Sequence, residues 1–353
     1  MKYPALITNT AKLAENINII QKICAENNIS FCAVTKSFCA APGMTGVYYK
    51  AGVRDFADTR LPNLRKINYP GVTKWLLRLP MLSEAEEVVE TADISLNSET
   101  ATVEALSGHA VKLGRKHKII LMVDVGDLRE GVLPGDAVNI AGEMLKLPGI
   151  ELHGIGVNYN CFGGVIPTLE SLNIITGVVK EITGKYGVNI NVISGGNSGS
   201  MHLLTSRTMP EEITNLRLGE VVFFGRETSY QQLIPHMHED IFRLDAQIIE
   251  LKKKPSMPVG EIGLNAFGEE VVFCDRGDML RAIVACGRQD VDIGKIKPLE
   301  PGVEILGQSS DHMILNVTDA DKPYKVGGVI SFSIAYGALL SLSTSEYVYK
   351  VYE

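Results

Sequence analysis

The sequence predicts an α/β protein of two domains, an N-terminal (β/α)8 TIM-like barrel and a C-terminal all-β domain. Up to about residue 230, short apolar runs alternate with helical patterns in about eight units, which is typical of such a barrel. Beyond that point, strand-length runs are separated by Gly, Pro and Asp, without a long amphipathic helix. We assign residues 8–230 to the barrel and 231–353 to the β-domain, with residues 1–7 as a candidate extra strand of the latter.

Each barrel unit begins with a short apolar run that we expect to form a buried strand. These runs lie at 30–36, 55–59, 75–79, 94–97, 118–124, 152–157, 190–193 and 215–224. Between them, apolar residues recur at helical spacing, most clearly in 13–24 and 168–186. Ser83 and Ser98 are expected to cap the starts of two further helices, and Gly187 is expected to end the helix 168–186.

The β-domain is expected to consist of short strands joined by tight turns. Its candidate strands are 246–251, 270–274, 280–286, 303–306, 313–317, 329–334 and 346–351.

Composition and charge restrict the class of protein. The chain is 45% hydrophobic and 21% charged, as ordinary folded proteins are, and its net charge of -7 argues against nucleic acid as a partner. Its six cysteines form no CxxC pair and lack zinc-site spacing, which favours a reduced, cytoplasmic protein without a metal. We find neither a signal-peptide core nor an apolar run near the ~18 residues of a membrane span.

Lys36 is the residue that points most directly to a chemistry. It ends the apolar run that begins at Ser30, and a turn of small residues follows. In a barrel, the C-terminal end of a strand faces the catalytic mouth, where desolvation favours a neutral, nucleophilic amine. A strand-end lysine can also reach out to water, so this segment alone leaves both interpretations open.

The segment 194–200, Ser-Gly-Gly-Asn-Ser-Gly-Ser, is a candidate anion site. Its glycines permit close backbone approach, its hydroxyls can donate, and late barrel loops often bind phosphate. A plain flexible turn is the alternative. The segment lacks Walker-loop spacing, and no GxGxxG follows a strand, so nucleotide and dinucleotide binding are not expected.

A strand-end lysine, a phosphate cradle and a barrel together suggest pyridoxal phosphate as the cofactor. The chain resembles the alanine racemase family of pyridoxal-phosphate enzymes (fold type III), and most of all its ornithine racemase branch. The resemblance extends over the whole chain and rests on 33–36, 215–220, 258–263 and 286–290. It implies an enzyme that interconverts L- and D-amino acids, with ornithine as the expected substrate, by removing and returning the α-proton.

The resemblance also implies residues that hold the cofactor. Lys36 would bind the cofactor covalently and act as one of two acid/base groups. Arg217 would donate to the pyridine nitrogen of the cofactor, which makes the cofactor a weaker electron sink. The other cofactor contacts implied are Asn158, Asn197, Ser198, Gly199 and Tyr336. Asn158 stands where alanine racemases have a histidine packed on the ring, so the ring is expected to be held differently here.

Substrate contacts and the second base are also inferred from the resemblance. Arg129 would bind the substrate carboxylate, and Asp311 would contact the substrate. Alanine racemases supply a tyrosine from the partner subunit as second base, but the matching segment here has none. Glu261 is our candidate for that base and His312 competes with it; a carboxylate in this region would also suit the distal ammonium of ornithine or lysine.

Several interpretations stay open on the sequence alone. The family arrangement implies a head-to-tail homodimer acting on a small-molecule amino acid. The alternatives are a racemase of alanine, serine or lysine, and a non-catalytic pyridoxal-phosphate-binding protein. The last of these consists of the barrel alone, so the additional β-domain argues against it.

Overall fold

The barrel is built from eight parallel strands that close on one another in chain order. The computed structural model describes all residues, 1–353. The strands are β2 (Ser30–Val34), β3 (Asp55–Asp58), β4 (Thr73–Leu76), β5 (Ile94–Asn97), β6 (His117–Met122), β7 (Ile150–Gly156), β8 (Val192–Ser194) and β9 (Asn215–Leu218). In the closing pair of strands, Ser30 of β2 lies opposite Asn215 of β9. The predicted (β/α)8 barrel with an added all-β domain is confirmed.

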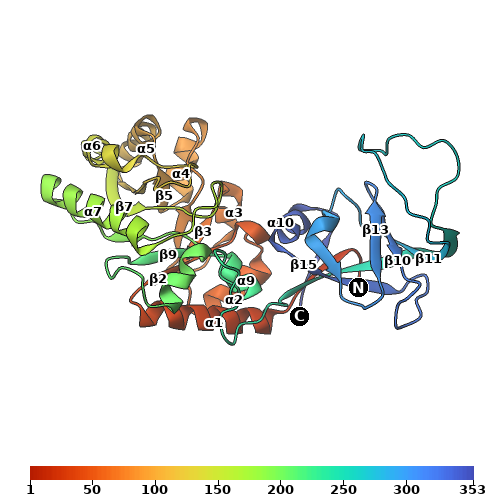
Figure 1. Cartoon of the computed structure of the whole chain (residues 1–353). Coiled ribbons are helices and arrows are strands. Elements are labelled where there is room, and N and C mark those ends of the chain that lie inside the picture. The colour runs from red at the N-terminus through yellow and green to blue at the C-terminus, as the bar shows by residue number, and fades with distance from the viewer. The chain divides into compact units, whose positions relative to one another are not determined.

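Helices surround the strands, so both faces of the sheet are buried (Figure 1). They are α1 (Thr10–Glu26), α2 (Pro42–Lys50), α3 (Leu61–Lys66), α4 (Ala85–Thr91), α5 (Thr100–Lys112), α6 (Pro134–Met144), α7 (Leu169–Tyr186), α8 (Met201–Thr205) and α9 (Glu220–Phe224). Every residue of β5 and β9 is buried, so the polar residues that alternate with apolar ones in both strands are also shielded from water. Cys32, Val34, Trp75 and Ile120 belong to one core cluster shared by neighbouring strands.

The helix ends predicted from the sequence agree with the structure where a specific capping interaction is present. Thr168 and Ser171 form a capping box at the start of α7, and Gly187 ends that helix in the left-handed conformation with φ 66°. The expected caps at Ser83 and Ser98 are wrong: Ser83 lies inside a 3-10 turn before α4, and Glu99 precedes α5 without a side-chain cap.

The β-domain is an antiparallel sheet whose strands run in the order β12-β15-β10-β11-β14-β13. These strands are β10 (Phe242–Pro255), β11 (Asp278–Val284), β12 (Ile296–Pro298), β13 (Glu304–Gln308), β14 (Met313–Asn316) and β15 (Val329–Ile334). Strand β1 (Ala5–Thr8) pairs with β10 and with β16 (Tyr349–Tyr352), which brings the N-terminus into this sheet. One helix, α10 (Tyr336–Thr344), follows β15.

Contacts divide the chain into Thr10–Glu239 and a second unit made of Met1–Asn9 with Asp240–Glu353. The division falls beyond residue 230 because the segment before Asp240 packs on the barrel. Asn16 of α1, which is fully buried, donates from Nδ2 to Val222 O at 2.9 Å and to His238 O at 2.8 Å. Its Oδ1 accepts from His238 N at 2.8 Å. No helix is long and apolar enough to cross a membrane.

The segment 256–277 joins β10 to β11 without a helix or strand and forms a long loop at the end of these strands (Figure 1). The strand expected at 270–274 is wrong, because no neighbouring strand pairs with it. Val259 and Val272 are 97% and 94% exposed, so apolar side chains project from this loop.

A buried histidine makes the barrel sensitive to acid. His117 at the start of β6 is 2% exposed, and its Nε2 lies 2.8 Å from Ser95 Oγ on β5. Burial, helped by the charge of Arg115, lowers the pKa of His117 from 6.5 to about 4. Because the unfolded chain binds the proton more readily, the stability of the barrel is unaffected by this group above pH 6.5. It falls as the pH drops from 6.5 toward 4.

Replacing His117 with glutamine is expected to reduce this acid sensitivity. Between pH 7 and pH 5, the free energy of unfolding should fall by about 2 kcal/mol more in the wild type than in His117→Gln. Only the wild type has a side chain at position 117 that binds a proton on unfolding. Urea unfolding at both pH values, followed by circular dichroism, measures the difference. Equal losses in the two proteins would contradict the buried neutral histidine.

Candidate active site

Most of the residues selected from the sequence lie at the C-terminal end of the barrel strands. Lys36 follows β2 and opens a 3-10 turn (Lys36–Phe38). Arg129 lies in the loop after β6, Asn158 follows β7, and the segment 197–199 follows β8. Since the carboxyl ends of parallel barrel strands meet at one face, these side chains share the catalytic end of the barrel.

Arg217 is held by neutral oxygens in the barrel wall. It lies on β9 and is 4% exposed, and Nη1 donates to Ser194 Oγ while Nη2 donates to Val157 O at 2.7 Å. Ser194 in turn donates to Asn215 Oδ1 at 2.7 Å. Burial lowers the pKa of Arg217, and the negative charge of Glu130 opposes this effect. The guanidinium is therefore fixed in place while its charge stays available to a ligand.

Arg129 forms an ion pair with the neighbouring Glu130. The side-chain amide of Asn158, turned so that its oxygen faces the guanidinium, accepts from Arg129 Nη2 at 2.6 Å. The same amide lies 3.2 Å from Asn197 Nδ2. In this orientation the two amide nitrogens face each other, so Asn158 bonds to Arg129 and only lies next to the glycine-rich loop after β8.

A buried aspartate fixes the loop that carries Arg129. Asp127 is 2% exposed, and its carboxylate accepts from three backbone amides of the next loop: Cys161 N at 3.2 Å, Phe162 N at 3.1 Å and Val165 N at 3.2 Å. The loops after β6 and β7 are thus joined, which limits the positions that Arg129 can take.

The glycine-rich loop is held in place by side-chain bonds to backbone groups. Asn197 Oδ1 accepts from Gly199 N at 2.8 Å, and Asn197 Nδ2 donates to Tyr159 O at 2.6 Å. Ser198 is 5% exposed, and its hydroxyl accepts from Val221 N at 3.2 Å. These bonds occupy the N–H groups of Gly199 and Val221 and join the glycine-rich loop to the start of α9.

The space beside this loop is too small for extra side-chain atoms. A Cβ on Gly196, whose φ is +111°, would lie 2.7 Å from Ser200 Oγ, and a Cβ on Gly199 would lie 3.1 Å from Ser229 Oγ. Glycine therefore suits both positions, because a side chain would crowd neighbouring serine hydroxyls. Together with the buried donor Arg217, these features fit a phosphate-bearing, ring-containing cofactor such as pyridoxal phosphate.

Sequence reasoning missed several polar residues at this end of the barrel. Glu220 is one: burial raises its pKa, and the charge of Lys36 opposes the rise, so a carboxylate lies within electrostatic range of the lysine. Asp58 at the end of β3 is fully buried and bonded to Thr35, next to Lys36. The signal that could have found Asp58 is its position, a charged residue one place before the end of the predicted buried strand 55–59.

The remaining selected residues belong to the β-domain. Tyr336 is the first residue of α10, and Glu261 is exposed in the 256–277 loop. Asp311 and His312 lie in the turn between β13 and β14, where Asp311 Oδ1 accepts from Gln289 Nε2 at 2.6 Å. The selected residues of the barrel therefore all belong to the unit Thr10–Glu239. The selected residues of the β-domain belong to the other unit.

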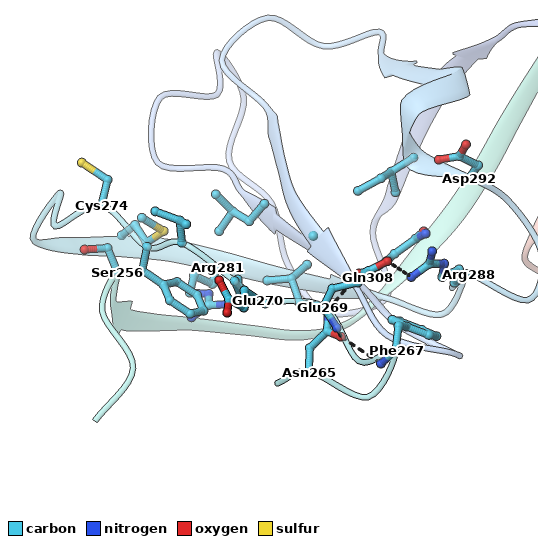
Figure 2. Close-up of a pocket in the computed structure, with 18 of the residues that line it drawn as sticks. Ser256, Asn265, Phe267, Glu269, Glu270, Cys274, Arg281, Arg288, Asp292 and Gln308 are labelled. Carbon is cyan, nitrogen blue, oxygen red and sulfur yellow. Dashed lines mark hydrogen bonds and ion pairs between the residues drawn. The ribbon is translucent and has the colours of Figure 1, made fainter. Parts of the chain in front are cut away.

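A cavity of about 1010 Å³ lies in the β-domain between its sheet and the 256–277 loop (Figure 2). Charged side chains in it pair with each other, as in the ion pair between Arg288 and Glu269 at 2.9 Å. Asn265 Oδ1 accepts from the backbone of Phe267 at 2.8 Å. The ion pair joins the loop to the segment after β11, the Asn265 contact lies within the loop, and none of the cavity's lining residues belongs to the barrel unit.

Fold and site define a class: a barrel enzyme with a strand-end lysine and a glycine-rich loop after β8, extended by a β-domain. Residues 8–227 match the family model described as the alanine racemase N-terminal domain. The chain belongs to the alanine racemase family, and the resemblance inferred from its sequence is confirmed.

Two curated relatives match almost the whole chain. An ornithine racemase of Acetoanaerobium sticklandii is 44% identical over 350 residues, 99% of both chains. A lysine racemase of Thermotoga maritima is 38% identical over 355 residues, 100% of this chain and 99% of its own.

Solved structures show the same fold at lower identity. An alanine racemase of Clostridium difficile superposes with a TM-score of 0.75 at 19% identity, covering 99% of this chain and 95% of its own. An alanine racemase of Bartonella henselae, described as having covalently bound pyridoxal phosphate, gives a TM-score of 0.76 at 17% identity and 99% coverage of both chains.

Proposed function

We propose that this protein is a pyridoxal-phosphate-dependent amino-acid racemase whose substrate is ornithine. The observation that carries the substrate is the 44% identity to an ornithine racemase over 99% of both chains. The lysine racemase at 38% identity supports the same substrate class, because ornithine and lysine both end in an ammonium group. Alanine and serine lack that group.

The barrel residues would hold the cofactor at three points. Lys36 would bind it covalently, Arg217 would donate to its pyridine nitrogen, and Asn197, Ser198 and Gly199 would bind its phosphate. When bound, pyridoxal phosphate withdraws electrons from the α-carbon of the substrate and so acidifies the α-proton. Tyr336 would add a phosphate contact from the β-domain.

Racemisation requires a proton donor and acceptor on both faces of the α-carbon. Lys36 Nζ would take and return the proton on one face, and Glu261 on the other, with His312 as the competing residue. Arg129 would orient the substrate carboxylate, and Asp311 would accept from the distal ammonium. In the arrangement that the family implies, the β-domain residues come from the partner subunit, so we propose a head-to-tail homodimer, located in the cytoplasm.

Replacing Glu261 with glutamine tests its assignment as the second base. In D2O, deuterium exchange at the α-carbon should persist for the enantiomer whose proton faces Lys36 and fall about 10²-fold for the other, because only one face loses its base. Nuclear magnetic resonance of L- and D-ornithine measures both rates. Glu270→Gln, an exposed carboxylate of the same loop, is the matched control. Equal loss on both faces, or none, would reject Glu261 and direct the test to His312.

A panel of amino acids tests the substrate. Chiral chromatography of ornithine, lysine, alanine and serine incubated with the cofactor-loaded protein should show the highest kcat/KM for ornithine. If kcat/KM is higher for lysine, alanine or serine, that amino acid is the substrate and the assignment of ornithine is wrong. Cofactor binding without turnover of any amino acid would favour the non-catalytic pyridoxal-phosphate-binding protein.

A further inference from the structure

The backbone around Lys36 has an unusual conformation. Within residues 35–40, called the Lys36 turn, Cys39 and Ala40 have φ values of +53° and +48°. Two consecutive non-glycine residues therefore adopt the left-handed region. Such residues are strained and persist only where surrounding contacts hold them, most often at functional sites.

The backbone of the Lys36 turn is closed by its own hydrogen bonds. Phe38 N and Ala40 N both donate to Thr35 O at 3.2 Å, and Cys39 N donates to Lys36 O at 3.3 Å. These distances lie at the long end of the range for backbone hydrogen bonds.

Aromatic packing supports one side of the turn. Phe38 is 3% exposed, stacks on Tyr48 with ring centroids 6.2 Å apart, and meets Phe223 edge-on at 5.7 Å. This packing fixes the side chain of Phe38. It supplies no hydrogen bond to the strained residues Cys39 and Ala40.

Polar side chains of β3 and α3 connect the two ends of the turn. At its start, the Thr35 hydroxyl donates to Asp58 Oδ2 at 2.6 Å, and Asp58 Oδ1 accepts from Asn63 Nδ2 at 3.0 Å. At its end, Lys66 Nζ donates to Cys39 O at 2.9 Å and to Asn63 Oδ1 at 3.1 Å. The chain of bonds therefore runs without a gap from Thr35, before Lys36, to Cys39, after it.

We propose that Asp58, Asn63 and Lys66 form a polar clamp that fixes the Lys36 turn, and that they act as positioning residues for Lys36. The clamp holds the backbone on both sides of the lysine, including the strained residue Cys39 that follows it. The role of Lys36 rests on the proposed function, whereas the clamp itself is a property of the folded barrel. None of these residues touches substrate or cofactor in this proposal.

Hydrogen–deuterium exchange of the full-length protein tests the clamp without cofactor or substrate. Thr35→Val should speed exchange of the amides at 38–40 by about tenfold, because a buried hydrogen bond is lost, and Lys66→Met by about threefold, because its bonds are exposed. Lys66 is exposed, so its replacement should not unfold the barrel. The matched control is Arg65→Met: this neighbouring cation on α3 pairs with Glu87 at 2.7 Å instead. Thr35→Ser and Lys66→Arg keep the donors and should restore slow exchange.

The link to Lys36 is tested by the rate at which added pyridoxal phosphate attaches to the protein, followed by visible absorbance. This rate and kcat should fall about tenfold in Lys66→Met with KM changed less than about twofold, because the lysine is displaced while substrate contacts remain. Exchange in Lys66→Met no faster than in Arg65→Met would overturn the clamp. Faster exchange with unchanged attachment and kcat would overturn its role in positioning Lys36. Failure of the wild type to bind the cofactor would reject the proposed function, while the exchange data would still decide the clamp.

Discussion

Replacing Lys36 with alanine should abolish racemisation, with a loss of at least about 10⁴-fold in kcat. The variant removes both the amine that would bind the cofactor and the acid/base group on one face of the substrate. The rest of the fold should persist, because Lys36 is the half-buried residue between the buried residues Thr35 and Ser37.

Two measurements check this expectation. The wild type, treated with pyridoxal phosphate and borohydride, should gain the mass of the reduced cofactor on the peptide that contains Lys36, and Lys36→Ala should not. Lys50→Ala, an exposed lysine at the end of α2, serves as control and should keep both the adduct and the activity. Turnover by Lys36→Ala near the wild-type rate would refute the assignment.

Arg217→Met should cause the second largest loss, about 10²–10³-fold in kcat, because it removes a fixed positive donor from a buried position in the barrel wall. Its effect on the fold should be measurable too. Ser194 Oγ and Val157 O would lose the donor that now satisfies them in the barrel wall, which costs about 1–3 kcal/mol per buried group.

Arg217→Lys separates the two effects. An ammonium keeps the charge but cannot donate to both oxygens and a ligand in the planar geometry of a guanidinium, so activity should be intermediate. Steady-state kinetics with urea unfolding of each variant gives both quantities. Full activity in Arg217→Met would contradict the proposed contact with the cofactor ring.

The sequence predicts the barrel and its catalytic end well because both depend on local patterns. A buried parallel strand is a short apolar run, and the residue that ends it must lie at the mouth of the barrel. Lys36 and Arg217 were found in this way. The family resemblance, rather than spacing, supplied their roles.

Tertiary proximity explains what the sequence did not predict. The bond between Thr35 and Asp58 joins residues 23 positions apart, and no local pattern indicates it. The short helix α10 (Tyr336–Thr344) was missed because a short apolar run does not distinguish helix from strand. The run 270–274 has strand-forming residues, but strand formation requires a neighbouring strand, and none is available there.

The central claim is that this barrel racemises ornithine, and the progress of the reaction from each pure enantiomer tests it most directly. Polarimetry of L-ornithine and of D-ornithine with the cofactor-loaded protein should end, in both cases, at zero rotation and equal amounts of the two enantiomers. Enantiomers have equal free energies, so a racemase must reach the same mixture from either side. Optical rotation that stays constant in both solutions would contradict the account.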